Sequence, residues 1–107
     1  MTVERFHAFL LEHVFVNITD RNTGFDSPLI SHFSPKDFAI VIDRCERMGV
    51  EIYGIEVFVN DIGFITCVIA PGDGYGWARH LVDEYRGRLD IAFSATYGEA
   101  NNLPLPI

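Results

Sequence analysis

Apolar residues recur at intervals of three and four in three stretches of the chain, and this spacing is typical of the buried face of a helix. The first stretch covers residues 2–14. The second is the clearest: Ser34 is placed to cap the helix, Pro35 occupies its first position and Gly49 ends it. The third opens at Trp77 in the segment WARHLVDEYRG. We therefore predict three helices.

The segment between the first two helices is rich in polar residues that favour turns. It has the sequence NITDRNTGFDSPLISHF over residues 17–33. Ser27 and Pro28 have the order of a helix cap followed by a first helical residue. We predict one short helical turn at this point.

Two segments rich in β-branched and aromatic residues, VEIYGIEVFV and FITCVIA, predict a β-hairpin closed by the four residues NDIG. We pair Val59 with Phe64. One face of the hairpin then holds Tyr53, Ile55, Val57, Val59, Phe64, Thr66, Val68 and Ala70, and the other holds Ile52, Gly54, Glu56, Phe58, Ile65, Cys67 and Ile69. A third strand, DIAFSATYG, has an apolar face made by Ile91, Phe93, Ala95 and Tyr97.

The predicted order is helix, short helix, helix, strand, strand, helix, strand. This order indicates a small α+β sandwich in which helices pack on a mainly antiparallel sheet of three or four strands. A chain of 107 residues is the size of one domain. Within it we distinguish an N-terminal helix and irregular segment (1–33), a central unit of helix, hairpin, helix and strand (34–98) and a proline-rich tail (99–107).

The formal net charge of −7 disfavours nucleic acids and anionic membranes as partners. Between residues 51 and 76 the chain has no basic residue and four acidic ones: Glu51, Glu56, Asp61 and Asp73. Such a stretch is either an ordinary solvated face or a face that attracts a basic partner.

We expect a cytoplasmic protein. The N-terminal segment lacks the basic region and cleavage site of a signal peptide, and no apolar run approaches the roughly 20 residues that span a bilayer. Cys45 and Cys67 lie within apolar runs, so we expect both to be reduced and buried.

The segment VIAPGDGYGWARHL, residues 68–81, has the order of strand, glycine-rich loop and helix found in many phosphate-binding sites. A dinucleotide fingerprint would need a glycine where Trp77 stands, a P-loop would need a lysine, and Asp73 would repel a phosphate. We interpret these glycines as a tight corner. The histidines and cysteines lack the spacing of a metal site, so we expect neither a metal nor a cofactor.

Glu56 is the only charged residue on the second face of the predicted hairpin. If the first helix covers that face, Glu56 is buried and needs a polar partner. If the face is open, it is an apolar patch around a carboxylate, which suits a partner protein or a homodimer.

Residues 34–87 resemble small immunity proteins of bacterial polymorphic toxin systems, including contact-dependent growth inhibition. The similar features are a helix ending in Met-Gly, the strand segment YGIEVF and a tryptophan that opens the next helix. The resemblance implies a non-enzymatic protein that binds and neutralises one cognate toxin, often a nuclease with a basic surface.

From charge and expected exposure we select as partner-binding residues Glu56, Asp61, Asp73 and Tyr75, followed by Asp83 and Glu84 on the adjoining helix. Two alternatives remain open at this stage. One is a homo-oligomeric module that binds a small molecule or a partner, and the other is a small enzyme that uses Glu56 and a histidine.

Overall fold

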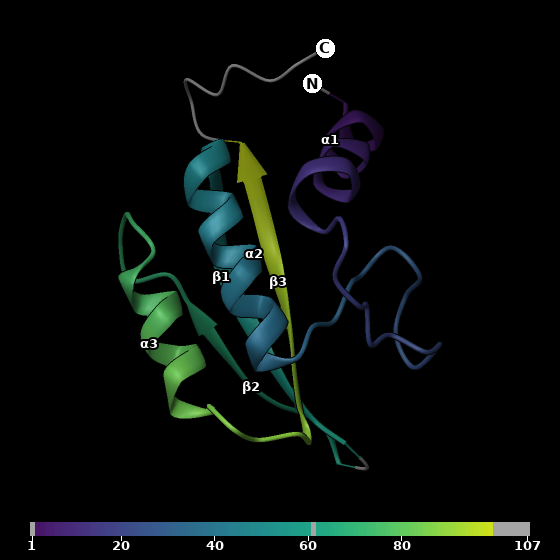
Figure 1. Cartoon of the computed structure of the whole chain (residues 1–107), viewed down its shortest axis with the longest axis vertical. Helices are drawn as coiled ribbons and strands as arrows, with labels where there is room; N and C mark the ends of the chain where they lie inside the picture. Colours follow the sequence, from purple (N-terminus) through teal and green to yellow (C-terminus); the bar gives the residue numbers. More distant parts are fainter. Residues whose placement is uncertain (1, 61, 100–107) are drawn as a thin grey trace.

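The computed structural model describes residues 2–60 and 62–99. Its elements are helices α1 (Val3–Phe9), η1 (Leu10–Val14) and α2 (Pro35–Met48), strands β1 (Val50–Val59) and β2 (Gly63–Ile69), helix α3 (Gly76–Glu84) and strand β3 (Ile91–Glu99). The described strands form one antiparallel sheet in the order β2-β1-β3. The predicted α+β fold and element order are confirmed (Figure 1). The tail from residue 100 onward lies outside the described residues.

Helices α1 and α2 begin at capping side chains, and α2 has the cap and stop residues predicted from the sequence. The Thr2 hydroxyl accepts a hydrogen bond from the Arg5 amide at 3.1 Å, and the Ser34 hydroxyl accepts one from the Asp37 amide at 3.2 Å. Gly49 ends α2 in the left-handed region with φ of 72°, a conformation that favours glycine. Each of these caps depends only on residues close in sequence, so the helix ends can be predicted from the sequence.

The second helical segment is η1, which continues α1 with the wider hydrogen bonding of a π-helix. Residues 27–30, where we predict a short helical turn, form one hydrogen-bonded turn and not a helix. In this turn the Ile30 amide donates to the Ser27 carbonyl at 2.9 Å. The Asn22 side-chain amide donates to the carbonyls of Asp26, Ser27 and Ile30. Because these acceptors are already used, the segment gains little from continuing as a helix.

A β-bulge in β1 changes the predicted assignment of side chains to faces. The pairing of β1 with β3 shifts between Ile52 and Gly54, so Tyr53 is an extra residue in the ladder. As a result, Ile52 is 5% exposed and belongs to the core, whereas Tyr53 is 45% exposed. The prediction is wrong for both residues: it placed Tyr53 on the face of Ile55 and Val57, and Ile52 on the face of Glu56.

A second bulge lies in β2. Val59 pairs with Gly63 and Phe58 pairs with Phe64, so the predicted pairing of Val59 with Phe64 is wrong by one residue. The register shifts before Val57 pairs with Thr66, which leaves Ile65 as the extra residue. The shift places Phe64 on the same face as Phe58, with ring centroids 5.7 Å apart.

The core lies between one face of the sheet and the helices. Figure 1 shows α2 in front of β1 and β3, with α3 beside it and near β2. The fully or largely buried side chains of this layer are Phe38, Val41, Ile42, Cys45, Val50, Ile52, Ile55, Val57, Ala78, Leu81, Val82, Ile91 and Phe93. Trp77 is partly buried and packs against this cluster. Helix η1, which continues α1, packs against α2.

Candidate partner-binding surface

The face of the sheet turned away from α2 and α3 carries apolar side chains in contact with solvent. We call it the open face and define it by Tyr53, Glu56, Phe64, Ile65, Cys67 and Ile69. Tyr53, Phe64, Ile65 and Ile69 are 45%, 54%, 42% and 70% exposed, respectively. Apolar groups gathered at this level of exposure are typical of an interaction site rather than of scattered surface residues.

Glycines allow side chains of the open face to lie flat on the sheet. A Cβ atom at Gly98 would collide with the ring of Tyr53, and one at Gly54 would meet the side chain of Ile69 at 3.4 Å. Tyr53 therefore covers part of β3, and Ile69 covers part of β1. The result is a flat, apolar surface across the strands.

One end of this side of the sheet is covered by the segment of residues 20–33. His32 is fully buried there, and its ring centroid lies 4.6 Å from that of Phe58. Phe25 packs on the same His32 ring at 4.7 Å. The Phe33 backbone pairs with Phe93 of β3, which fixes the segment along the edge of the sheet.

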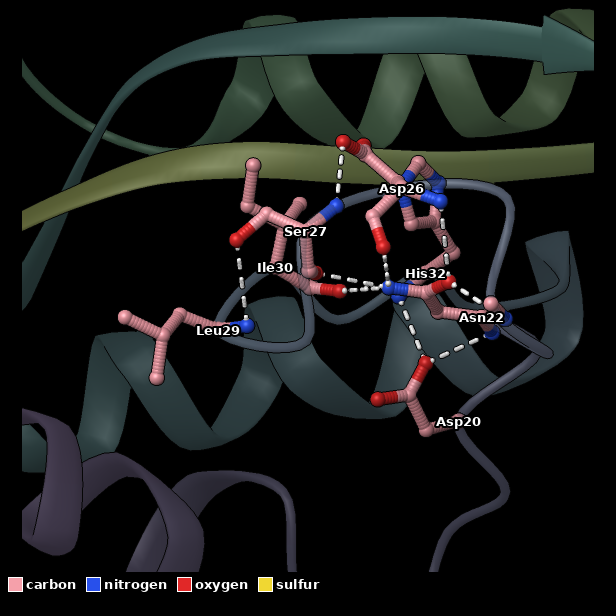
Figure 2. Close-up of polar contacts among 8 residues, drawn as sticks. Asp20, Asn22, Asp26, Ser27, Leu29, Ile30 and His32 are labelled. Carbon is pink, nitrogen blue, oxygen red and sulfur yellow. Dashed lines mark hydrogen bonds and ion pairs between the residues drawn. The ribbon is translucent and has the colours of Figure 1, made fainter.

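A hydrogen-bonded network holds this covering segment in shape (Figure 2). His32 Nε2–H donates to Asp26 Oδ2 at 2.7 Å, and the His32 backbone amide donates to Asp20 Oδ1 at 2.9 Å. Asn22 supplies the donors to three carbonyls described above. The hydrogen bond from His32 holds the pKa of the Asp26 carboxyl below its ordinary value. The hydrogen bond between His32 and Asp26 therefore helps to hold the covering segment in its conformation.

Glu56 lies on the open face and is half-buried. Its neighbours in the ladder are Cys67 on β2 and Ser94 on β3. Within residues 2–60 and 62–99 it forms no ion pair. Of the two possibilities raised by the sequence, the structure has the second: α1 does not cover this face, and Glu56 is a carboxylate within an apolar patch.

An acidic pocket adjoins the open face where β2 leads into α3. Its volume is about 550 Å³, and its lining is Gly49, Glu51, Ile52, Tyr53, Ile69, Ala70, Gly72, Asp73, Gly74 and Tyr75. The lining contains two carboxylates, Glu51 and Asp73, and no base. Glu51 beside the Tyr53 hydroxyl raises the pKa of that phenol. Tyr53 and Ile69 border both the pocket and the open face, so the two form one continuous surface.

The structure brings some of the predicted partner-binding residues together and separates others. Asp73 and Tyr75 line the acidic pocket, and Glu56 lies on the open face beside it. Asp83 and Glu84 are on α3, which packs on the other side of the sheet. There, Asp83 pairs with Arg86 at 2.6 Å and Glu84 with His80 at 3.3 Å. Asp61 lies outside the described residues.

Tyr75 has a structural role in addition to its place in the pocket. Its hydroxyl donates to the Val50 carbonyl at 2.7 Å, and its ring packs against the core cluster. Sequence reasoning missed Glu51 and Tyr53 as members of the surface. Glu51 was visible as the start of the acid-only stretch, but the outward position of Tyr53 depends on a bulge that the alternation of residues does not reveal.

The cysteines differ in their surroundings. Cys45 is fully buried, and burial raises the pKa of its thiol to about 12. Cys67 is exposed on the open face, so the prediction that both thiols are buried is wrong for Cys67. Cys67 lies on the same face of the sheet as Glu56, as predicted. It is exposed because none of the helices within residues 2–60 and 62–99 covers that face.

Three further findings bear on function. Within residues 2–60 and 62–99, no three His, Cys, Asp or Glu side chains are grouped so that they could hold a metal ion. None of the helices in that part of the chain has the length and apolar character required to cross a membrane. Comparisons with family models, with curated proteins and with solved structures found no match to this chain.

Proposed function

We propose that the protein is a non-catalytic immunity protein of the cytoplasm, which binds a cognate toxin domain with a basic surface and thereby neutralises it. The observation that carries the proposal is the continuity of the open face with the acidic pocket. The apolar side chains of the open face supply contact area that is lost from water on binding. The carboxylates of the pocket orient a basic partner and speed its approach.

The pocket fits one long basic side chain of the partner. Glu51 and Asp73 supply two carboxylates without a competing base in the lining. Tyr53 and Ile69 at its border offer an aromatic ring and an aliphatic chain against which the stem of a lysine or arginine packs. A toxin that binds nucleic acid must present such cations, and the net charge of −7 favours its approach.

Strand β2 extends this surface to an edge of the sheet. It is the outermost strand on its side of β1 and contains no charged residue from Gly63 to Ile69. Charged residues on an edge strand ordinarily discourage pairing with another chain, and here they are absent. A strand of the toxin that pairs with β2 would gain backbone hydrogen bonds beside the open face.

The test begins with identification of the toxin by affinity capture from the source cells, followed by titration of the two purified proteins. Ile69→Lys places a charge in the apolar surface and should weaken binding by about 10-fold or more. Leu29→Lys is the matched control, because Leu29 is equally exposed, at 71% against 70% for Ile69, but lies in another segment. A similar loss from both variants would contradict the proposed surface.

The charge contribution is tested in the same titration. Reversal of the pocket with Glu51→Lys and Asp73→Lys should lower affinity and remove most of its dependence on salt. The control is Glu12→Lys, since the Glu12 side chain is 73% exposed on η1, which packs against α2. If the toxin remains fully inhibited by the pocket variant at moderate salt, the acidic pocket is not part of the interface.

A second candidate function is a homo-oligomeric interaction module, favoured by the uncharged edge of β2. Two copies paired antiparallel through β2 would bring no like charges together along the strand, despite the net charge of each chain. Sedimentation equilibrium over a range of concentrations distinguishes the candidates. A dimer that Cys67→Pro abolishes, in the absence of any toxin, would favour the module over the inhibitor, because the alternation of the ladder directs the Cys67 amide away from β1.

A further inference from the structure

A basic cleft lies between the N-terminal end of α2, the C-terminal end of α3 and the loop that leads to β3. Its volume is about 750 Å³, and its lining is Arg21, Ser34, Pro35, Lys36, Ala39, Val82, Asp83, Arg86, Gly87, Arg88 and Leu89. It is on the helical side of the sheet, away from the open face. Neither the resemblance nor the proposed function accounts for it.

The charge of this cleft is opposite to that of the chain as a whole. Four of the eight lysines and arginines line it, whereas the net charge of the protein is −7. Asp83 is the only carboxylate in the lining. Asp37 in the first turn of α2 offsets the helix dipole, so the positive potential comes from the side chains.

Two of these cations are held in place by contacts within the protein. Arg21 donates to the carbonyls of Ile91 at 2.8 Å and Leu89 at 3.2 Å, bonds that fix the guanidinium without neutralising it. Arg88 is held by two hydrogen bonds to Asp90, at 2.8 and 2.6 Å. A site whose donors are already positioned loses less conformational entropy when a ligand binds.

The other two cations are more available. Lys36 is exposed and forms no ion pair within the described part of the chain. Arg86 is paired with Asp83 at 2.6 Å, but its side chain is 80% exposed, so solvent weakens that pair. An incoming anion can therefore engage both without first breaking a buried interaction.

The remaining lining is apolar and includes Pro35, Ala39, Val82 and Leu89. Leu89 is 88% exposed at the rim, so its side chain is open to a ligand. The volume falls in the range of about 300–1,000 Å³ that is usual for small-molecule sites. We infer that this cleft binds a small organic anion whose acidic group meets Lys36 and Arg86 and whose apolar body lies against Leu89.

The inference does not rest on the proposed function, and it is tested with three small probes on the full chain. Octanoate carries both the anionic group and an apolar body, 1-octanol lacks the charge and inorganic phosphate lacks the apolar body. We expect saturable changes of backbone amide shifts with octanoate at Ala39, Val82 and Leu89. The other two probes should bind at least about 10-fold more weakly.

Variants separate this site from non-specific attraction. Lys36→Gln with Arg86→Gln should weaken octanoate binding by at least about 10-fold. Arg5→Gln with Arg47→Gln removes the same charge at exposed positions outside the cleft and should change affinity by less than about two-fold. Circular dichroism and the amide spectrum establish that each variant is folded before titration.

Three outcomes would overturn the inference. One is equal binding of octanoate by the cleft variant and the control variant. Another is a set of shift changes located at the open face, at Phe64 and Ile69, instead of the cleft. The third is binding of inorganic phosphate or 1-octanol as tightly as octanoate, because the ligand would then not need both parts of the cleft.

Discussion

The hydrogen bond between His32 and Asp26 should be a principal support of the segment that covers one end of the sheet. His32 is completely buried, whereas the Asp26 side chain is 27% exposed. Replacement of Asp26 by alanine leaves the buried Nε2–H of His32 without its acceptor at 2.7 Å. We expect this variant to be destabilised without loss of any core packing around Phe58.

The size of the effect follows from the charge and burial of the pair. A hydrogen bond to a charged group contributes about 1.5–3 kcal/mol, and a buried donor left unpaired costs a similar amount. We therefore expect Asp26→Ala to lower the free energy of unfolding by about 2 kcal/mol. For a chain of this size, that loss lowers the melting temperature by about 8 °C.

A double-mutant cycle isolates the interaction from other effects of the substitution. His32→Phe removes the donor while retaining an aromatic ring between Phe25 and Phe58, which lie 4.7 and 4.6 Å from the imidazole. In the His32→Phe background, Asp26→Ala should cost less than about 0.5 kcal/mol. Thermal and urea unfolding at neutral pH measure all four proteins. An equal cost of Asp26→Ala in both backgrounds would refute the role assigned to the pair.

The same pair predicts a dependence on pH. The hydrogen bond from His32 places the pKa of Asp26 below its ordinary value of 3.8, so the folded chain binds fewer protons at this site than the unfolded chain. The contribution of the ionised carboxylate is complete above that ordinary value and is lost as the pH falls through the lower folded pKa. The difference in stability between the natural protein and Asp26→Ala should therefore shrink between about pH 5 and pH 2.

Three further predictions concern individual residues. A thiol reagent should modify Cys67 in the native protein, because this cysteine is exposed. Cys45 should react only after unfolding, because it is buried and burial raises the pKa of its thiol to about 12. Two reactive thiols in the native protein would contradict the structure. Tyr75→Phe removes the hydrogen bond to the Val50 carbonyl and should cost about 1 kcal/mol in urea unfolding, with little change in toxin affinity. Gly49→Ala should cost about 1 kcal/mol in the same assay because φ is 72°, and an unchanged midpoint would argue against that conformation.

Sequence reasoning succeeds here where the cause of a structure is local. The hydroxyl of Ser34, the fixed φ of Pro35 and the left-handed conformation of Gly49 define α2 within a few residues of each end. The apolar face of β3 is also confirmed, since Ile91 and Phe93 are fully buried. Each of these features depends on a residue and its immediate neighbours.

The predicted register of the sheet is wrong because its cause is not local. The extra residues Tyr53 and Ile65 are bulges, and a bulge is defined by which residues of another strand pair on either side of it. Both residues fit a regular strand when considered alone. Only contacts distant in sequence, such as Tyr53 lying over Gly98, distinguish the bulged register from the regular one.

The candidate surface was predictable in part, because some of its features are local in sequence and others depend on how the elements pack. The lack of bases between residues 51 and 76 drew attention to Asp73, which lines the acidic pocket with Glu51. The sequence did not reveal that α3 places Asp83 on the other side of the sheet. Charge patterns predict the sign of a surface, but the layer in which each residue lies depends on how the elements pack.

Helix α2 connects the two surfaces proposed to bind ligands. The basic cleft lies at its N-terminal end, at Lys36, and the acidic pocket lies beyond its C-terminal end, at Gly49. Its 14 residues rise by about 1.5 Å each, so about 20 Å separates the two sites. At ordinary ionic strength, charges this far apart are largely screened.

If both proposals hold, a bound anion and a bound toxin should therefore affect each other only if α2 itself shifts. Any such coupling must be reciprocal, because the anion can change toxin affinity only by the factor by which the toxin changes anion affinity. The caps at both ends of α2 and its buried stripe against the sheet oppose a shift. We expect octanoate to leave the affinity for the toxin unchanged within about two-fold. A larger effect in titrations with and without octanoate would show that α2 moves as a unit between two positions.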